Sequence, residues 1–266
     1  MEAAVAAMRR YCIDYTSGHD QSVCDEIMAP DYEITVSGQT MAMDAYRRAV
    51  SAAFRRYPTL ALTVHDLLLS GDRLAMRFSE HGAADGDPDR VAVWQGIALY
   101  RWGDGRLRSC RVEQDFAGRD AQASSGATAP LEPAHPDPWA TTRDTAPDPS
   151  AEAALHAWLQ ALAADPAATL ADPRVHLLEH GGDGAPLLAQ QRITVDDLFS
   201  AGNRVAAAIS IAGVYDGGLD GVDATATGRP GVLPATLLAT AVDGDVHEVW
   251  LVRDRWGLVR RLRDPR

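Results

Sequence analysis

Apolar and polar positions alternate with two different periods along the first half of the chain. Apolar residues first recur every three or four positions, and this spacing predicts helices over residues 2–16, 20–28 and 43–56. Alternation of apolar and polar residues, with Gly and Asp between the runs, predicts strands over residues 32–36, 60–69, 73–81, 91–102 and 106–115. Helices followed by consecutive antiparallel strands are typical of an α+β fold. We expect a cone, in which a curved, mostly antiparallel sheet wraps around N-terminal helices and leaves one apolar pocket at its open end.

The end of this half is repeated near the end of the chain. DGRLRSCRVEQD runs from Asp104 to Asp115, and DGDVHEVWLVRD runs from Asp243 to Asp254. Each copy predicts an Asp-Gly hairpin turn followed by a strand with an Asp at its end. The repeat indicates two related domains in tandem, over residues 1–120 and 151–266.

Residues 121–150 separate the two domains and show neither period. They are rich in Pro, Ala, Ser and Thr, which predicts a partly extended linker, and we expect Trp139 to rest on a domain surface. A flexible chain of this length has a root-mean-square span of roughly 30 Å. The two domains can therefore pack side by side.

The second domain is shorter than the first. Strands are predicted over residues 175–180 and 193–199, and the intervening GGDGAPLLAQQR is too short for a counterpart of the helix over 43–56. A cone without that helix has an open or shallow pocket. We expect an abbreviated second domain that acts mainly as a structural partner, and a second active site remains the alternative.

Composition limits the partners of the protein. The formal net charge is −12, which disfavours binding to nucleic acid phosphates. No apolar run approaches the ~20 residues of a membrane span, and charged residues interrupt the N-terminal apolar run where a signal peptide has none. The three cysteines form no CxxC pair and are expected to be reduced and buried. These features predict a cytoplasmic protein with neither a membrane nor a nucleic acid partner.

Several segments resemble one protein family. CDEIMAPDYEITVSG, RFSEHGAADG and IALYRWGDGRLRS, together with the terminal Asp115, resemble the SnoaL-like polyketide cyclases of the nuclear transport factor 2-like superfamily. The similarity covers most of residues 5–122, and the second half resembles the family more weakly through SIAGVYDGGLDG and DGDVHEVWLVRDRWGLVRRL. Domains of this superfamily commonly dimerise through their sheets. The resemblance therefore implies an internal pseudo-dimer of the two domains, and it leaves an additional homodimer open.

The resemblance also implies catalytic residues. In that family an Asp near the end of the last strand often acts as the general base of an intramolecular aldol ring closure, and by position this residue is Asp115. His81 aligns with a family histidine and is the expected proton partner, although a histidine that caps a strand end is the alternative. In the second domain Asp254 keeps the terminal position, whereas Tyr215 stands in place of His81 and Trp250 in place of Arg111.

Ring closure of a poly-keto substrate sets physical requirements on the site. It begins with removal of a proton from a carbon between carbonyls, which needs a base in a dry pocket and a donor for the enolate oxygen. Strand alternation places Arg111, Glu113 and Asp115 on one face. If this face lines the pocket, Glu113 is a second candidate base; if it is the outer face, the three residues form a charged stripe.

Aromatic side chains are the candidate substrate-binding walls of the pocket, since aromatic rings stack on planar substrates. Each of them can equally serve as core packing. The candidates are Tyr15, Tyr32, Tyr46 and Trp94.

The sequence thus favours a cofactor-independent cyclase or isomerase that acts by general acid–base chemistry on an apolar, polyketide-like small molecule. Motifs for nucleotides are absent and no histidine spacing suits a metal, so neither a cofactor nor a metal is implied. One alternative is an epoxide hydrolase or cyclase of the polyether type, for which Asp31 or Glu33 would have to face Asp115. The other is a non-catalytic ligand-binding or scaffold protein.

Overall fold

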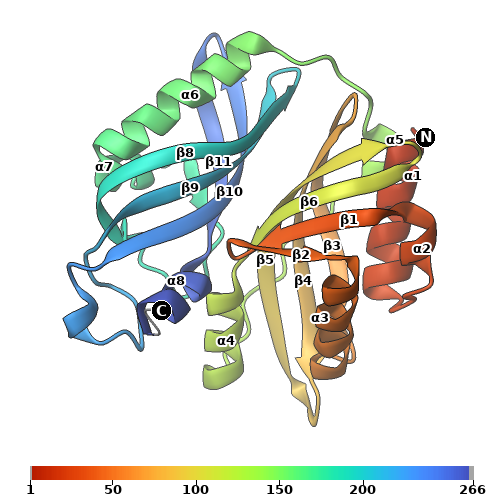
Figure 1. Cartoon of the computed structure of the whole chain (residues 1–266), viewed down its shortest axis with the longest axis horizontal. Coiled ribbons are helices and arrows are strands. Elements are labelled where there is room, and N and C mark those ends of the chain that lie inside the picture. The colour runs from red at the N-terminus through yellow and green to blue at the C-terminus, as the bar shows by residue number, and fades with distance from the viewer. Residues whose placement is uncertain (1, 264–266) are drawn as a thin grey trace.

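The first domain is an α+β cone. The computed structural model describes residues 2–263, and its first half builds a six-stranded sheet in the order β2-β1-β6-β5-β4-β3, parallel only between β1 and β6 (Figure 1). Its elements are α1 (Ala3–Arg10), the π-helical segment η1 (Tyr11–Ser17), α2 (Val23–Ile27), β1 (Met28–Val36), β2 (Gln39–Ala42), α3 (Met43–Arg56), β3 (Ala61–Ser70), β4 (Arg73–Ala84), β5 (Asp87–Gly103), β6 (Arg106–Gln114) and α4 (Phe116–Ser125).

The second domain repeats this plan with fewer elements. Its sheet has the order β7-β11-β10-β9-β8 and is parallel only between β7 and β11, as β1 and β6 are in the first domain. The loop between β7 and β8 holds no helix, so the expectation of an abbreviated α+β domain is confirmed. The elements are α5 (Pro138–Thr141) in the connection, then α6 (Pro149–Ala164), α7 (Pro166–Leu170), β7 (Val175–Leu177), β8 (Leu188–Ala201), β9 (Arg204–Tyr215), η2 (Ala224–Ala226), β10 (Pro230–Val242), β11 (Asp245–Arg253) and α8 (Arg255–Arg263).

The two Asp-Gly turns have the conformation that the sequence predicts. Asp104 and Gly105 have φ of 50° and 74°, and Asp243 and Gly244 have φ of 51° and 84°. Left-handed backbone at both central positions matches the twist of the flanking strands, and Gly and Asp are among the residues that tolerate it. Each turn leads into a last strand that has neighbours on both sides: β6 lies between β1 and β5, and β11 lies between β7 and β10.

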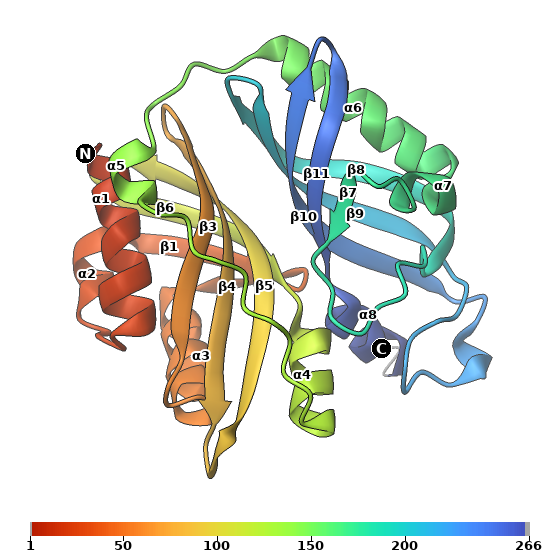
Figure 2. The same ribbon diagram turned by 180° about the vertical axis from the view of Figure 1, so that it is seen from behind.

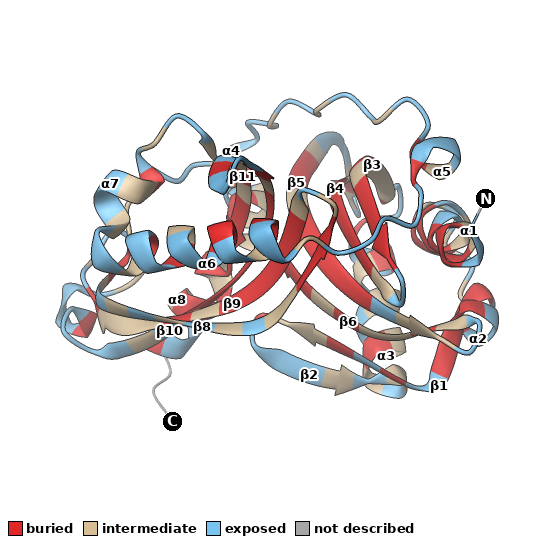
Figure 3. Cartoon of the chain, turned by 90° about the horizontal axis from the view of Figure 1, so that it is seen from above, coloured by how far each residue is buried: buried red, intermediate tan, exposed pale blue. Residues whose placement is uncertain are grey.

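The sheets of the two domains pack against each other through a shared apolar core. Ile97 and Leu99 of β5 meet Leu238 of β10 and Val252 of β11, all of them buried. The hydroxyl of Thr236 donates a hydrogen bond to the carbonyl of Ile97 at 2.9 Å. Figure 3 shows that burial is concentrated where the two sheets face each other. The tandem domains thus form one continuous body.

Segment 121–150 differs from the expected linker at its start. Helix α4 occupies its first five residues, because Asp115 accepts a hydrogen bond from the backbone N–H of Gly118 at 3.0 Å and begins a helix there. The remainder runs as a strap along the outside of the first sheet before it crosses to α6 (Figure 2). His135 N–H donates to the carbonyl of Val64 at 2.9 Å, and Trp139 packs against the first core, as the sequence suggested.

None of the described helices combines the length and the apolar character that a bilayer span requires.

Candidate functional site

The cone of the first domain encloses a cavity of about 410 Å³ whose walls are rich in aromatic side chains. This volume falls within the range of small-molecule sites. Its aromatic lining consists of Tyr11, Tyr15, Tyr46, Phe54, Tyr57, Phe78, Trp94, Tyr100 and Phe116 of the first domain and Trp256 of the second.

Strand alternation decides which polar groups reach this cavity. Along β6 the side chains of Cys110, Val112 and Gln114 line it, and along β4 those of Phe78 and Glu80 do so. Among the described residues that line the cavity, Glu80 is the only one with a carboxylate. The cone thus presents a single carboxyl group within a wall rich in aromatic side chains.

Glu80 is held by a neighbouring indole. Trp94 Nε1–H donates to Glu80 Oε2 at 3.1 Å and to Gln114 Oε1 at 2.8 Å. Burial raises the pKa of Glu80 to about 7, although the charge of Arg119 and the hydrogen bond from Trp94 act in the opposite direction. Near neutral pH this carboxyl group therefore exists in both protonation states, which suits a general base that must also return its proton.

Arg119 places a positive charge at the same end of the cavity. Its guanidinium carbon lies 4.6 Å from the ring centroid of Phe116 and 5.6 Å from that of Trp94. These distances are within the range of cation–π contacts. A fixed cation beside Glu80 can stabilise negative charge that develops on a bound molecule.

Phenol groups supply further donors inside the cavity. Tyr11 and Tyr46 share a hydrogen bond of 2.9 Å between their hydroxyl oxygens. The buried hydroxyls of Tyr15 and Tyr57 have no hydrogen-bond partner among the described residues. A buried donor without a partner is costly, so a ligand oxygen at either hydroxyl would be favoured.

Asp115 does not line this cavity, so of the two alternatives for its face of the strand the structure has the outer face. Its carboxylate is 2% exposed and lies at the junction of the two domains. Besides the N–H of Gly118, it accepts hydrogen bonds from the N–H of His180 at 2.6 Å and from Arg255 at 2.7 Å. The carboxylate therefore caps α4 and binds the second domain.

Arg111 and Glu113 share the outer face with Asp115, as strand alternation requires. Arg111 lines a small pocket together with Asp196 and Asp197 of the second domain. Glu113 is buried and accepts a hydrogen bond from the N–H of Ser37 at 3.1 Å. The three residues thus form a charged stripe on the outer face, and the second domain contacts its Asp115 end through His180 and Arg255.

His81 also points away from the cavity, because it follows Glu80 on β4 and successive side chains face opposite sides. Its Nε2 lies 3.2 Å from the hydroxyl of Thr63, and burial lowers its pKa. Of the four aromatic candidates, Tyr15, Tyr46 and Trp94 line the cavity. Tyr32 is fully buried behind Tyr46, with ring centroids 5.9 Å apart.

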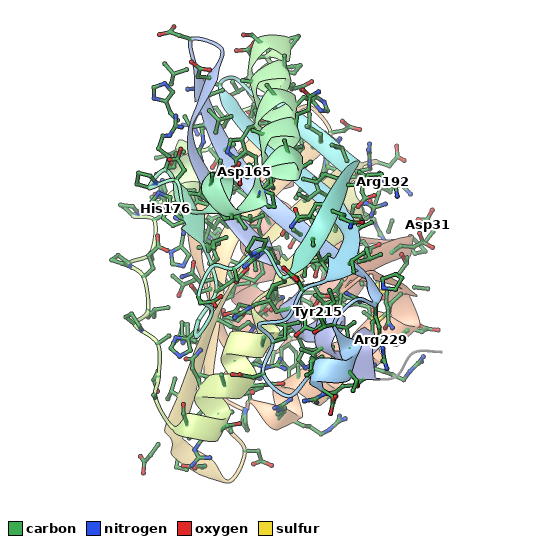
Figure 4. All side chains as sticks on the ribbon, turned by 90° about the vertical axis from the view of Figure 1, so that its left-hand side faces the viewer. Asp31, Asp165, His176, Arg192, Tyr215 and Arg229 are labelled. Atoms are coloured by element: carbon green, nitrogen blue, oxygen red, sulfur yellow. The ribbon has the colours of Figure 1, made fainter. Side chains whose placement is uncertain are left out.

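The residues of the second domain that correspond to Asp115, Arg111 and His81 bind neighbouring parts of the protein. Asp254 caps α8 by accepting from the N–H of Gly257 at 2.8 Å, and it accepts from the Ser37 hydroxyl at 3.1 Å. The Trp250 ring stacks on His176 at 4.2 Å, and the Tyr215 hydroxyl accepts from the N–H of Leu219 at 3.1 Å. Figure 4 shows His176 at one side of the molecule and Tyr215 near the centre of the view.

The carboxylates considered for epoxide chemistry do not face Asp115. Figure 4 places Asp31 at the periphery, where it pairs with Arg108 at 3.3 Å in a solvent-exposed position. Glu33 is exposed on the outer face of β1. The carboxylate pair required for that alternative is therefore not assembled from these residues.

The comparisons with known proteins agree with the fold of the first domain. Residues 8–110 match the family model of the SnoaL-like domain. The match covers 103 of the 266 residues, all of them in the first domain, which is therefore similar to the SnoaL-like domain over this segment. No curated protein matches the chain.

Solved structures with similarity to the chain each align with somewhat less than half of it. A protein from Jannaschia sp. CCS1 described as a SnoaL-like polyketide cyclase is 20% identical, with 46% of this chain and 92% of that chain covered and a TM-score of 0.43. IdmH from Streptomyces antibioticus is 20% identical, with 46% and 99% covered and a TM-score of 0.42. An NTF2-like protein of unknown function from Burkholderia pseudomallei is 16% identical, with 47% and 100% covered and a TM-score of 0.41.

The junction of the two domains yields a prediction on stability. Burial and the nearby carboxylate of Asp254 raise the pKa of Glu113 well above its usual range. A carboxyl group whose pKa is higher in the folded protein contributes stability below its unfolded pKa of about 4.3, and this contribution is lost as the pH rises through the folded pKa. The free energy of unfolding is therefore expected to fall as the pH rises above about 4.3, and to fall less in Glu113→Gln.

Urea unfolding at several pH values measures this difference. Glu33→Gln, an exposed carboxylate on the same face, is the control and should keep the slope of the wild type. An unchanged slope in Glu113→Gln would show that Glu113 titrates as it does in the unfolded chain.

Proposed function

We propose that the protein is a cofactor-independent cyclase or isomerase that removes a proton from a carbon next to a carbonyl in an apolar, polyketide-like small molecule. The observation that carries the proposal is the position of Glu80, a carboxyl group with a pKa near 7 in an aromatic cavity of a SnoaL-like domain. The aromatic walls suit a planar, ring-forming substrate.

In the proposed reaction Glu80 takes the proton from the substrate carbon, and the electron pair of the C–H bond moves to the carbonyl oxygen as an enolate. The hydroxyl of Tyr15 or Tyr57 and the charge of Arg119 stabilise that oxygen. The enolate carbon attacks a second carbonyl of the same molecule, and the new alkoxide takes the proton back from Glu80. The step is an isomerisation, so no co-reactant is consumed.

The roles of the other residues follow from their contacts. Trp94 orients the Glu80 carboxylate by donating to it, and Gln114 accepts from the same N–H. We assign to Asp115 and Asp254 the task of holding the two domains together, and to the second domain the support of the cavity mouth. In this proposal the base is Glu80, and His81 has no contact with the substrate.

Deuterium exchange tests the proposal without knowledge of the natural ring system. The bicyclic ketone 2-tetralone is incubated in D₂O with the wild-type protein, and loss of the α-proton signal is followed by NMR. We expect exchange faster than in buffer, with competitive inhibition by 2-naphthol, which resembles the enol. Binding of 2-naphthol without accelerated exchange would identify a ligand-binding protein in place of a catalyst.

A further inference from the structure

The wall of the first domain's cavity includes one side chain from the second domain. Apart from Trp256 of α8, every described residue that lines the cavity belongs to residues 11–119. The Trp256 ring meets that of Phe116 edge-on, with centroids 6.0 Å apart and an interplanar angle of 73°. The guanidinium of Arg260 lies 4.6 Å from the Trp256 centroid. The indole is thus packed between a side chain of the first domain and one of its own helix.

The backbone that carries Trp256 is fixed on both sides of it. Asp254 caps the first turn of α8 through the N–H of Gly257, and Arg255 binds Asp115 at 2.7 Å. Helices α4 and α8 lie side by side at the junction of the domains in Figures 1 and 2. The position of the ring is therefore set by the contact between the domains.

Trp256 also borders a second, larger space. A cleft of about 690 Å³ lies between α4, α8 and the loops that follow β7 and β9, and Trp256 is part of its wall. Helix α4 contributes Phe116 and Arg119 to the cone cavity and Ala117, Asp120 and Ala121 to the cleft. Among the described residues, Trp256 is consequently the one that lines both spaces.

We propose that Trp256 is the specificity-determining residue that limits the length of the ligand in the cone, and that the cleft receives the part of a longer ligand that passes it. The inference rests on the cone cavity being the ligand site of the proposed function. The cleft differs from the cone in its chemistry, because Arg253, Arg255 and Glu179 lie in its wall beside Leu187 and Val259. An elongated molecule with an apolar, ring-forming end and a polar tail fits the two spaces together.

Binding of a rigid length series tests this role. The probes are 2-naphthol, 6-phenyl-2-naphthol and 6-(4-biphenylyl)-2-naphthol, titrated by their own fluorescence. We expect the wild type to bind the longest probe at least about tenfold more weakly than 2-naphthol, and Trp256→Ala to reduce that ratio to about threefold or less. Trp256→Phe keeps a ring at the position and should keep most of the discrimination.

Trp158→Phe is the matched control, because Trp158 packs in the core of the second domain and lines neither space. It should bind all three probes as the wild type does. Equal discrimination in Trp256→Ala and the wild type would overturn the inference, as would a wild type that binds the three probes alike. Failure of every variant to bind 2-naphthol would overturn the proposed function and this inference with it, whereas an unchanged length profile leaves the proposed function intact.

Discussion

Replacement of Glu80 by glutamine is expected to lower the rate of α-proton exchange in 2-tetralone by a factor of about 10² to 10⁴, the range that a positioned general base contributes. Glutamine keeps the size of the side chain and can still accept from Trp94, but it cannot take a proton at neutral pH. The loss should appear in kcat rather than in the affinity for 2-naphthol, because the cavity walls are unchanged.

The pH dependence identifies the base. Because burial raises the pKa of Glu80 to about 7, the wild-type rate is expected to rise about tenfold per pH unit below that value and to level off above it. Glu80→Gln should lack this dependence. Glu113→Gln removes another buried carboxyl group, outside the cavity, and should retain the wild-type profile. If Asp115→Asn abolished exchange while Glu80→Gln retained it, the base would be Asp115.

Loss of folding would not explain a loss of activity in Glu80→Gln. A carboxyl group with a raised pKa lowers stability above that pKa, since its charged form is desolvated. Glutamine avoids this cost, so at about pH 8 the variant is expected to be at least as stable as the wild type in urea unfolding. An inactive but stable variant therefore separates chemistry from stability.

The sequence predicts the elements well where periodicity is strong. Helix α3 spans Met43–Arg56 as its apolar spacing indicates, and β3 to β6 begin and end close to their expected bounds. Strand β2 was missed because it has only four residues, too few for alternation to show. Helix α4 was missed because the Ser and Gly residues in it resemble a linker, although its first residue follows a capping Asp.

A short motif could have revealed both terminal helices. The chain reads DFAG from Asp115 and DRWG from Asp254, so the same spacing separates Asp and Gly in each copy. In both, a Cβ on the Gly would collide with the Asp carboxylate, which occupies that space while it accepts from the Gly N–H. A capping Asp with a Gly three residues later is thus a structural reason for the repeated Asp, independent of catalysis.

The candidate base could not be chosen from the sequence for a different reason. Glu80 and His81 are adjacent on β4, and Gln114 and Asp115 are adjacent at the end of β6, so either member of each pair could face the pocket. Which face is inside depends on where the helices pack and on the second domain, which covers the charged face. Those contacts join residues distant in the sequence and leave no periodic signal within a strand.

The second large effect is expected at the junction between the domains. Substitution of Arg255 by methionine should lower the free energy of unfolding by about 3–5 kcal/mol, the cost of leaving a buried charge without its partner. Asp115 and Arg255 are both buried, and the shared hydrogen bond of 2.7 Å places the two charges in contact. Urea unfolding of the full chain measures the loss.

A double-mutant cycle shows whether the cost comes from the unpaired carboxylate. Asp115→Asn removes the charge and keeps a side chain that can cap α4. In that background Arg255→Met should cost clearly less than it does alone, because the charge of Asp115 no longer needs a partner, and Glu179, the other buried carboxylate near Arg255, is still paired with Arg253. Additive losses would show that the two charges do not interact and that Arg255 acts only by packing.

The ion pair between Arg261 and Asp254, the equivalent Asp of the second domain, provides the control. Arg261 binds Asp254 at 3.2 Å, but the Arg261 side chain is 39% exposed, so water can screen and replace it. Arg261→Met should therefore cost about 1 kcal/mol or less, although it breaks an ion pair to the equivalent Asp.

Because Arg255 precedes Trp256, the same Arg255→Met protein should also lose part of its discrimination in the naphthol series, whereas Arg261→Met should retain it. This asymmetry would mean that the repeated Asp serves the two domains differently: both carboxylates cap a helix, but only the pair with Arg255 also fixes the wall of the cavity.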